Sequence, residues 1–509
     1  MALIRYLLLF LVVVVQSGNG WCETPSRQPA HVCVLFFNDL HGHLTPFEIE
    51  ESGRRTEVGG IARMASLIRD IRSENKKSGV ETLVLVAGDL LQGTPLSTVF
   101  KGEPDLQCLN IMGVSAMTVG NHEFDFGFEN FLNLKREAAF PFLSVNIMVK
   151  KTNRLLCDSH MAIPLKDGLW VTVIGVTTPE LMTTTRQENV ASLIPIDPVQ
   201  AVKTLYNKVK GRGPVILLSH SRHLTDRAIA EAVPELGAII GGHDQVLLSP
   251  YRVAAGVPIF QAFEKGRYLG RIDFSIDPAT KKAHLDRHDY LPVTSSIKPD
   301  PEIQKLVSAY TEKLGAKFKT VIGSSEIFLD GERGRIRYEE TTLGNFIADI
   351  MVVHTGATIG LINAGAIRSS IRKGPVTVED VFKAMPYENE LMLMDLTGAE
   401  IKKALERSVR SERAEEDGGF LHVSGLFIDV RGKEISAIRM KDNKTPIDPK
   451  GVYRVVVPDF LGSGGDGHEV FKNRSCQKSG LPLRELIVET IAERKIVSAK
   501  KEGRIRRLK

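Results

Sequence analysis

Polar side chains that can bind a metal ion follow five short apolar runs in the first half of the 509-residue chain. These candidate ligands are Asp39, His41, Asp89, Asn121, His220, His243 and Gln245. A single residue of this kind more often caps a strand, but recurrence at five strand ends favours a shared site. In open α/β sheets the ligand site lies beyond the carboxyl ends of the strands, so we expect these groups to converge.

The candidate ligands offer carboxylate, amide and imidazole groups but no thiolate. This set suits Mn, Fe, Co, Ni or Zn, or Mg bound together with a substrate, and it argues against an iron–sulfur cluster or structural zinc. Seven ligands exceed what one tetrahedral ion needs, which predicts two ions that share Asp89. Asp39 and His41 are two residues apart, so they are expected to point to one side of extended chain. Glycines before three of the ligands are expected to leave room for the ions.

The elements that must position these groups alternate between apolar runs and helical stretches from His31 to about Ile276. The runs expected to be strands are Val32–Phe37, Leu83–Ala87, Ala116–Val119, Phe142–Ile147, Val171–Val176, Val215–Leu218, Ala238–Ile240 and Pro258–Phe263. This alternation predicts a layered α/β domain whose strands are buried on both faces.

The pattern changes near Pro292, where a polar stretch with prolines begins. Pro301–Lys319 is then expected to form one amphipathic helix between domains. The domains we predict are a signal peptide at 1–20, a catalytic domain at 28–295, a linker helix at 296–320 and a substrate-binding domain at 321–509.

The five strand-end motifs resemble those of the calcineurin-like metallophosphoesterases. They are Asp39-x-His41, Gly88-Asp89, Gly120-Asn121-His122-Glu123, His220 and Gly241-Gly242-His243. The form Gly-Asn-His-Glu-Phe-Asp and the length of the second domain narrow the resemblance to the secreted 5′-nucleotidases. This implies a four-layer α-β-β-α metallophosphoesterase domain followed by a smaller α/β 5′-nucleotidase C-terminal domain.

The resemblance also implies roles for the residues. One divalent ion is held by Asp39, His41, Asp89 and Gln245, and the other by Asp89, Asn121, His220 and His243. The candidate metals are Mn, Zn, Co, Fe and Mg, and two such ions acidify a water and neutralise phosphate oxygens. His122 and Asp125 resemble the family's catalytic pair, in which the carboxylate orients the imidazole and favours its charged form. Glu123 is expected to hold this loop in place by hydrogen bonds.

The second domain is expected to select the substrate. By the same resemblance, its substrate-binding residues are Asn363, Gly365, Arg368, Tyr387, Phe460 and Asp466. Arg368 suits phosphate because of its planar fork, Tyr387 and Phe460 match positions that sandwich the base, and Asp466 matches a partner of the ribose hydroxyls. Several relatives have a basic residue where this chain has Thr342, and Arg335, Arg337 and Arg372 are the candidates to replace it.

These features predict an exported, metal-dependent 5′-nucleotidase that hydrolyses nucleoside 5′-monophosphates, with UDP-sugars or 2′,3′-cyclic nucleotides as further substrates. Two alternatives stay open. One is a related metallophosphoesterase that acts on another ester, such as a cyclic phosphodiesterase or a sulfur-oxidation hydrolase. The other is a non-catalytic nucleotide-binding protein. The expected partner is a small nucleotide, with no nucleic-acid polymer, and the protein is expected to be a monomer or homodimer.

The N-terminus predicts export to the periplasm or the extracellular space. The apolar run Tyr6–Val15 is too short to span a bilayer, and small residues precede a cleavage site near Gly20. A lipid anchor at Cys22 is less favoured, because Trp21 is too bulky for the usual processing site. No later stretch predicts a transmembrane helix.

Charge and cysteine content add two expectations. The net charge of +5 is concentrated in a basic C-terminal tail from residue 494, expected to be a solvated helix end. The tail lacks the interleaved aromatic residues of a nucleic-acid surface. Five cysteines in so long a chain predict buried thiols for the most part, with no disulfide framework.

Overall fold

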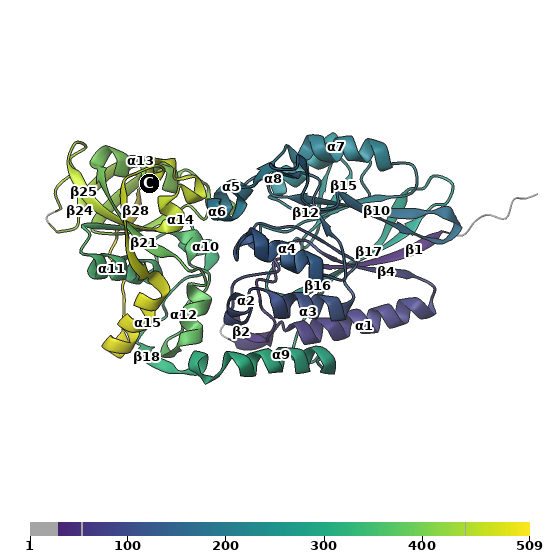
Figure 1. The fold of residues 1–509 in the computed structure, drawn as a ribbon, viewed down its shortest axis with the longest axis horizontal. Coiled ribbons are helices and arrows are strands. Elements are labelled where there is room, and N and C mark those ends of the chain that lie inside the picture. The colour runs from purple at the N-terminus through teal and green to yellow at the C-terminus, as the bar shows by residue number, and fades with distance from the viewer. Residues whose placement is uncertain (1–28, 52–53, 443, 509) are drawn as a thin grey trace, which may run out of the picture.

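The computed structural model describes residues 29–51, 54–442 and 444–508 (Figure 1). The predicted signal peptide and Cys22 lie outside the described residues. The catalytic domain and the C-terminal domain lie side by side, and helix α9 (Pro301–Leu314) runs along one edge between them (Figure 1). Among the described residues, no helix has both the length and the apolar character needed to cross a membrane.

Two six-stranded sheets form the centre of the catalytic domain. The first has the order β17 (Ala283–Pro292), β16 (Tyr268–Ile276), β1 (Ala30–Phe37), β4 (Glu81–Val86), β5 (Ala116–Thr118), β6 (Phe142–Leu143). The second has the order β14 (Arg252–Ala254), β15 (Val257–Phe260), β13 (Ala238–Ile240), β12 (Val215–His220), β10 (Trp170–Thr177), β9 (His160–Pro164). Strands β1, β4, β5 and β6 are parallel, and so are β10, β12, β13 and β15. Their carboxyl ends therefore meet at one edge of each sheet.

The two sheets pack face to face, and helices cover their outer faces. Val34 of β1 and Val173 of β10 belong to one apolar cluster between the sheets. The next residue, Leu35, instead packs with the helices outside the first sheet. These outer helices are α1 (Ile61–Lys77), α3 (Glu103–Met112), α4 (Phe128–Glu137) and α9 on the first sheet, with α7 (Pro198–Val209) and α8 (His223–Ala232) on the second. This arrangement confirms the expected four-layer α-β-β-α fold.

One expected strand, Phe142–Ile147, is divided in the structure. It yields β6 and, in a separate three-stranded sheet, β7 (Ile147–Val149). The residues between them leave the first sheet because they bond to the second. Asn146 Nδ2 donates to the carbonyl of Thr177 at 2.8 Å, and Thr177 N donates to Asn146 Oδ1 at 2.9 Å. Polar side chains thus interrupt the apolar run.

The connecting helix is shorter than the sequence pattern suggests. α9 ends at Leu314, Gly315 follows with φ 81°, and Ala316–Lys319 forms a separate 3-10 turn. The prediction of one helix over Pro301–Lys319 is therefore wrong at its C-terminal end, because a glycine readily leaves helical φ/ψ. Tyr310 Oη donates to Glu103 Oε1 at 2.6 Å, so α9 is joined to the helical layer of the catalytic domain.

A five-stranded sheet forms the core of the C-terminal domain. Its order is β22 (Leu421–Ser424), β19 (Ile359–Asn363), β25 (Val452–Pro458), β21 (Glu390–Thr397), β26 (Cys476–Pro482). Helices α11 (Thr342–Thr355), α13 (Gly398–Val409) and α15 (Leu483–Arg494) share the apolar core of this sheet. Asn363 ends β19, Phe460 follows β25 in α14 (Asp459–Gly462), and Tyr387 precedes β21. Three neighbouring strands thus carry these substrate candidates.

The basic C-terminal tail is not a solvated helix end, which corrects that expectation. α15 ends at Arg494, and the last residues form β28 (Ile505–Leu508), which pairs with β23 (Leu426–Arg431). Arg504 is buried and donates to Asp349 Oδ1 and Oδ2, each at 2.7 Å. Arg504 and Arg506 of the tail therefore form ion pairs within the domain.

The cysteines follow the expectation for the most part. Among the described residues, Cys33, Cys108 and Cys157 are buried free thiols, and Cys476 is an exposed free thiol. Burial raises the pKa of Cys33 to about 12, since it disfavours the charged thiolate. These buried thiols behave as small apolar residues of the core.

Candidate active site

The candidate metal ligands converge at the carboxyl-end edge of the two sheets. Asp39 follows β1, Asp89 follows β4, Asn121 follows β5, His220 ends β12 and His243 follows β13. The side chains of Asp39, Asp89 and His220 have at most 2% of their surface exposed. The sequence-based expectation that these strand ends meet at one point therefore agrees with the structure.

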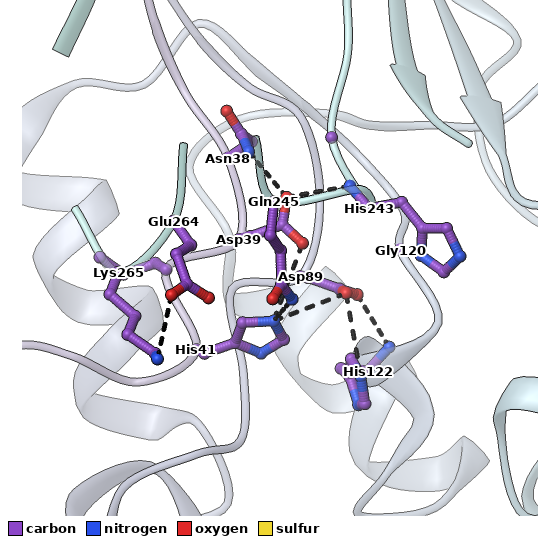
Figure 2. Close-up of polar contacts among 12 residues, drawn as sticks. Asn38, Asp39, His41, Asp89, Gly120, His122, His243, Gln245, Glu264 and Lys265 are labelled. Carbon is purple, nitrogen blue, oxygen red and sulfur yellow. Dashed lines mark hydrogen bonds and ion pairs between the residues drawn. The ribbon is translucent and has the colours of Figure 1, made fainter. Parts of the chain in front are cut away.

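Asp89 lies beside the imidazoles of His41 and His122 (Figure 2), and it also contacts His220. Its Oδ2 is 3.1 Å from Nε2 of His220 and 3.9 Å from Nε2 of both His41 and His122. The ligand atoms of His41, Asp89 and His122 lie within 4.8 Å of one another, and so do those of Asp89, His220 and His243. A carboxylate shared between two groups is the arrangement expected for a pair of ions.

Asp39 and Gln245, which the resemblance assigns to the same ion as His41, lie beside His41. Its Nε2 is 3.7 Å from Asp39 Oδ1 and 2.7 Å from Gln245 Nε2. In the second group, His243 Nδ1 is 3.2 Å from His220 Nε2. Two ring nitrogens this close together are suited to bind the same metal ion.

Two oxygen atoms at this centre test whether the residues fit a cation. Asp39 Oδ1 and Asn121 Oδ1 are buried and have no hydrogen-bond partner among the described residues. A buried oxygen left in this state costs about 1–3 kcal/mol, and a divalent ion would remove that cost. The glycines leave the necessary room, because a Cβ at Gly120 would clash with Asp89 Oδ1. The residues therefore fit a divalent-metal centre.

Burial and the charges of neighbouring residues shift the pKa values of the candidate ligands, some upward and some downward. Burial raises the pKa of Asp39 to about 6 and lowers the pKa of His243 to about 4. Burial alone would lower the pKa of His220, but the carboxylates of Asp89 and Asp39 raise it to about 10. The carboxylates of the centre therefore favour the charged form of His220.

The backbone around the ligands is left-handed, which the sequence spacing did not indicate. The φ angles are 49° at Asp39, 48° at His41, 51° at Asp89, 74° at His243 and 58° at Gln245. The expectation that Asp39 and His41 share one side of extended chain is therefore wrong, because tight turns aim them instead. Such residues cost about 1–3 kcal/mol each and cluster at functional sites.

The candidate catalytic pair, His122 and Asp125, forms a hydrogen bond. His122 Nδ1 lies 2.7 Å from Asp125 Oδ2, so Nε2 is the nitrogen that faces Asp89. Burial alone would lower the pKa of His122, but Asp125 and Asp89 together raise it above its usual value. Glu123 accepts bonds from the backbone N–H groups of Asp89, Leu90 and Gly120, so it holds the loop as expected.

A cavity of about 320 Å³ lies between the two domains. On the catalytic side it is lined by Asp89, Asn121, His122, Asp125, His243 and Gln245. On the C-terminal side it is lined by all six substrate candidates, Asn363, Gly365, Arg368, Tyr387, Phe460 and Asp466. Asp39, His41 and His220 are buried behind this surface.

The substrate candidates approach the catalytic side closely. Arg368 Nη2 lies 3.3 Å from His41 Nε2, and the Tyr387 ring stacks near the His122 ring with 6.1 Å between centroids. At the other end, Asn363 Nδ2 donates to Asp466 Oδ2 at 2.7 Å. The Arg368 guanidinium thus lies beside the candidate metal ligand His41. Tyr387, Phe460 and Asp466 line other parts of the cavity.

Two further arginines, Arg333 and Arg337, belong to the cavity wall. Arg333 was not among the sequence-based site residues, and Arg337 was named only as a candidate to replace the basic group at Thr342. Arg333 begins α10 (Arg333–Ile336), Arg337 follows it, and both line the cavity. Arg333 Nη1 donates to Gln245 Oε1 across the domain boundary. The i, i+4 spacing of the two arginines, which places both on one helix face, is the signal that would have identified them.

The three arginines proposed to replace a basic group at Thr342 differ in whether they reach the cavity. Arg335 pairs with Asp330, and Arg372 pairs with Glu48, so both are engaged elsewhere. Arg337 alone of the three lines the cavity. Thr342 Oγ1 accepts a bond from Asp330 N at 2.8 Å and so supports the loop before α10.

Family comparisons agree with this two-domain architecture. Residues 34–247 match the calcineurin-like phosphoesterase model, and residues 321–473 match the 5′-nucleotidase C-terminal domain model. The crystal structure of a 5′-nucleotidase precursor from Thermus thermophilus is similar over 94% of this chain and 99% of that chain, with 30% identity and a TM-score of 0.87. A chain of this class is a metal-dependent phosphoric monoester hydrolase.

Two further proteins are similar to this chain over most of its length. The 5′-nucleotidase of Bos taurus is 28% identical over 535 residues, which cover 94% of this chain and 92% of that protein. The sulfate thiohydrolase SoxB of Thermus thermophilus shares the fold, with a TM-score of 0.80 over 94% of this chain and 96% of that chain, at 19% identity. The chain belongs to the 5′-nucleotidase family.

Proposed function

We propose that this protein hydrolyses nucleoside 5′-monophosphates to nucleoside and phosphate at a centre of two divalent ions. The observation that carries this proposal is the cavity itself. Its catalytic side is lined by Asp89, Asn121 and His243, and its C-terminal side carries two aromatic rings, Tyr387 and Phe460. Chemistry suited to phosphate and chemistry suited to a base thus lie in one continuous space.

The residues that would hold the ions are those of the resemblance. One ion would take Asp39, His41, Asp89 and Gln245, and the other Asp89, Asn121, His220 and His243. The donor set suits Mn, Zn, Co, Fe or Mg. When bound, such ions acidify a water and neutralise phosphate oxygens.

The chain's own groups would bind and orient the nucleotide. Arg368 and Arg337 would pair with phosphate oxygens, for which the guanidinium fork is suited. His122, kept in its charged form by Asp125, would donate from Nε2 to an oxygen on which negative charge develops. Asp466 would accept from the ribose hydroxyls. Tyr387 and Phe460 would stack on the base, which is worth roughly 1–3 kcal/mol per stacked base in nucleic-acid binders.

A second candidate is hydrolysis of a different ester by the same centre. The shared fold with the sulfate thiohydrolase SoxB favours it. UDP-sugars and 2′,3′-cyclic nucleotides are the other substrates this centre would accept. A non-catalytic nucleotide-binding protein is disfavoured, because every candidate ligand position carries a residue able to bind a metal.

Export and domain organisation belong to the same proposal. Residues 1–20 would be removed as a signal peptide, leaving a periplasmic or extracellular enzyme with domains at 28–295 and 321–509. The linker at 296–320 would serve as a hinge between the base-binding side and the metal side of the cavity.

The test is a substrate panel on the mature chain with and without a chelator. AMP is expected to be hydrolysed, chelation to abolish the activity, and Mn²⁺ or Co²⁺ to restore it. Full AMP hydrolysis by a metal-free sample would contradict the mechanism. Hydrolysis of a sulfur ester or a cyclic nucleotide in preference to AMP would favour the second candidate.

A further inference from the structure

A short segment of the catalytic domain lies against both sides of the cavity. It comprises α5 (Leu181–Thr184), Thr185, Arg186 and α6 (Gln187–Val190). In Figure 1, α5 and α6 lie at the boundary between the two domains, and α5 contacts the 3-10 turn Gly465–Gly467 of the C-terminal domain. The segment therefore touches the elements that carry the candidate substrate residues.

Two residues of the segment donate hydrogen bonds to backbone carbonyls of the loop that carries Asn121, His122 and Asp125. Thr185 Oγ1 donates to the carbonyl of Asn121 at 3.2 Å. Asn189 Nδ2 donates to the carbonyls of Phe124 and Asp125, at 2.9 and 3.1 Å. The segment is thus fixed to the loop that carries the candidate ligand Asn121 and the candidate catalytic pair.

Arg186, which lies between these two residues, reaches across to the other domain. Its Nη2 donates to the carbonyl of Glu388 at 2.5 Å and to Asp459 Oδ2 at 3.0 Å. Glu388 follows Tyr387 directly, and Asp459 directly precedes Phe460. Asp459 Oδ1 also accepts from Phe460 N at 2.8 Å. One guanidinium nitrogen therefore contacts both segments that carry the aromatic rings.

We propose that Arg186 is a positioning residue that fastens the two aromatic segments to the catalytic loop and so sets the distance between the base and phosphate ends of the cavity. The inference rests on the proposed stacking of a base by Tyr387 and Phe460. Arg186 makes both contacts through one nitrogen, so a lysine ammonium, which has three N–H donors, should satisfy them in part. Arg186 also lines the cavity.

Another ion pair between the domains provides a matched control. Arg372 Nη1 lies 2.7 Å from Glu48 Oε2, and its Nη2 donates to the carbonyl of Glu48 at 2.9 Å. About half of each of these two side chains is exposed, at 46% and 50%. This pair joins the same two domains by the same chemistry but contacts neither aromatic segment. Loss of Arg372 therefore reports on domain contact alone.

The test compares Arg186→Ala, Arg186→Lys and Arg372→Ala with AMP and with 4-nitrophenyl phosphate, which has no base. Arg186→Ala is expected to lower kcat/KM for AMP about tenfold, typical of a charge-assisted contact, and to leave the aryl phosphate within about twofold. Arg186→Lys should recover part of the loss. Arg372→Ala should leave both substrates near the wild-type rate. Thermal melting of each variant establishes that it is folded.

A second measurement addresses position directly. Asp459→Asn keeps an oxygen for Phe460 N but removes the charged acceptor, so its effect on AMP and that of Arg186→Ala should be less than additive in the double variant. Additive effects, or equal losses on both substrates, would overturn the inference. A wild-type enzyme active on AMP together with an unaffected Arg186→Ala variant would overturn this inference alone. Failure of the wild type on AMP would overturn the proposed function and the inference with it.

Discussion

On the catalytic side of the cavity most candidate ligands are buried and closely spaced, whereas on the C-terminal side most candidate substrate residues are only partly buried. Asp39 Oδ1 and Asn121 Oδ1 lack hydrogen-bond partners among the described residues, and so does Asn363 Oδ1 on the C-terminal side, where Asp466 accepts from Asn363 Nδ2. The ligand edge also carries left-handed backbone at five ligand positions. The catalytic side therefore already has its candidate ligands in position to bind an ion. The C-terminal side forms one wall of a cavity whose other wall belongs to the catalytic domain.

The largest effect is expected at the residue that both groups of the catalytic side share. Asp89→Asn removes the charge that would bridge the two ions, so kcat for AMP should fall by about 10³-fold or more. Steady-state kinetics and metal analysis of the purified variant measure this. Retention of both ions and of activity would show that Asp89 is only a structural carboxylate.

A smaller loss is expected from the catalytic loop. His122→Ala should lower kcat for AMP by about 10²- to 10³-fold, because a charged donor is removed from the transition state. Calorimetric titration with Mn²⁺ separates two roles, since His122 also lies within the group formed by His41 and Asp89. Unchanged ion binding supports the catalytic role, whereas loss of one ion would make His122 a ligand.

The C-terminal side should respond selectively. Changing both Tyr387 and Phe460 to Ala should lower kcat/KM for AMP by about 10- to 100-fold, following the energy of stacking one base. Hydrolysis of 4-nitrophenyl phosphate serves as the control and should stay near the wild-type rate. An equal fall for both substrates would mean that these rings support the fold and not the base.

The smallest effect distinguishes two neighbouring arginines. Arg337→Ala should raise KM for AMP about tenfold, because it removes a charged donor from the cavity wall. Arg335→Ala is the matched control, since Arg335 pairs with Asp330, and its KM should not change. A larger effect at Arg335 than at Arg337 would contradict the position given to the phosphate.

Residue type and strand order were enough to predict much of this molecule. The layered α/β domain and the convergence of Asp39, Asp89, Asn121, His220 and His243 follow from apolar runs that end in metal-binding residues, and the resemblance to a known family implied the four-layer form. The local conformation did not follow, because left-handed turns at aspartate and histidine leave no trace in residue spacing.

Long-range contacts account for the other differences. The break in Phe142–Ile147 depends on Thr177, a residue of the other sheet. The C-terminal tail becomes a strand because β23 and Asp349 are present to receive it. Arg186 and Arg333 acquire significance only from the opposite domain. A pattern within one stretch of sequence carries no information about such partners.

Titration of Mn²⁺ into metal-free mature protein, followed by calorimetry and AMP hydrolysis in parallel, tests the central claim most directly. Two ions per chain should bind, and activity should rise with their occupancy, whereas Asp89→Asn should bind neither ion tightly. A wild-type protein that hydrolyses AMP with one ion or none bound would contradict the account.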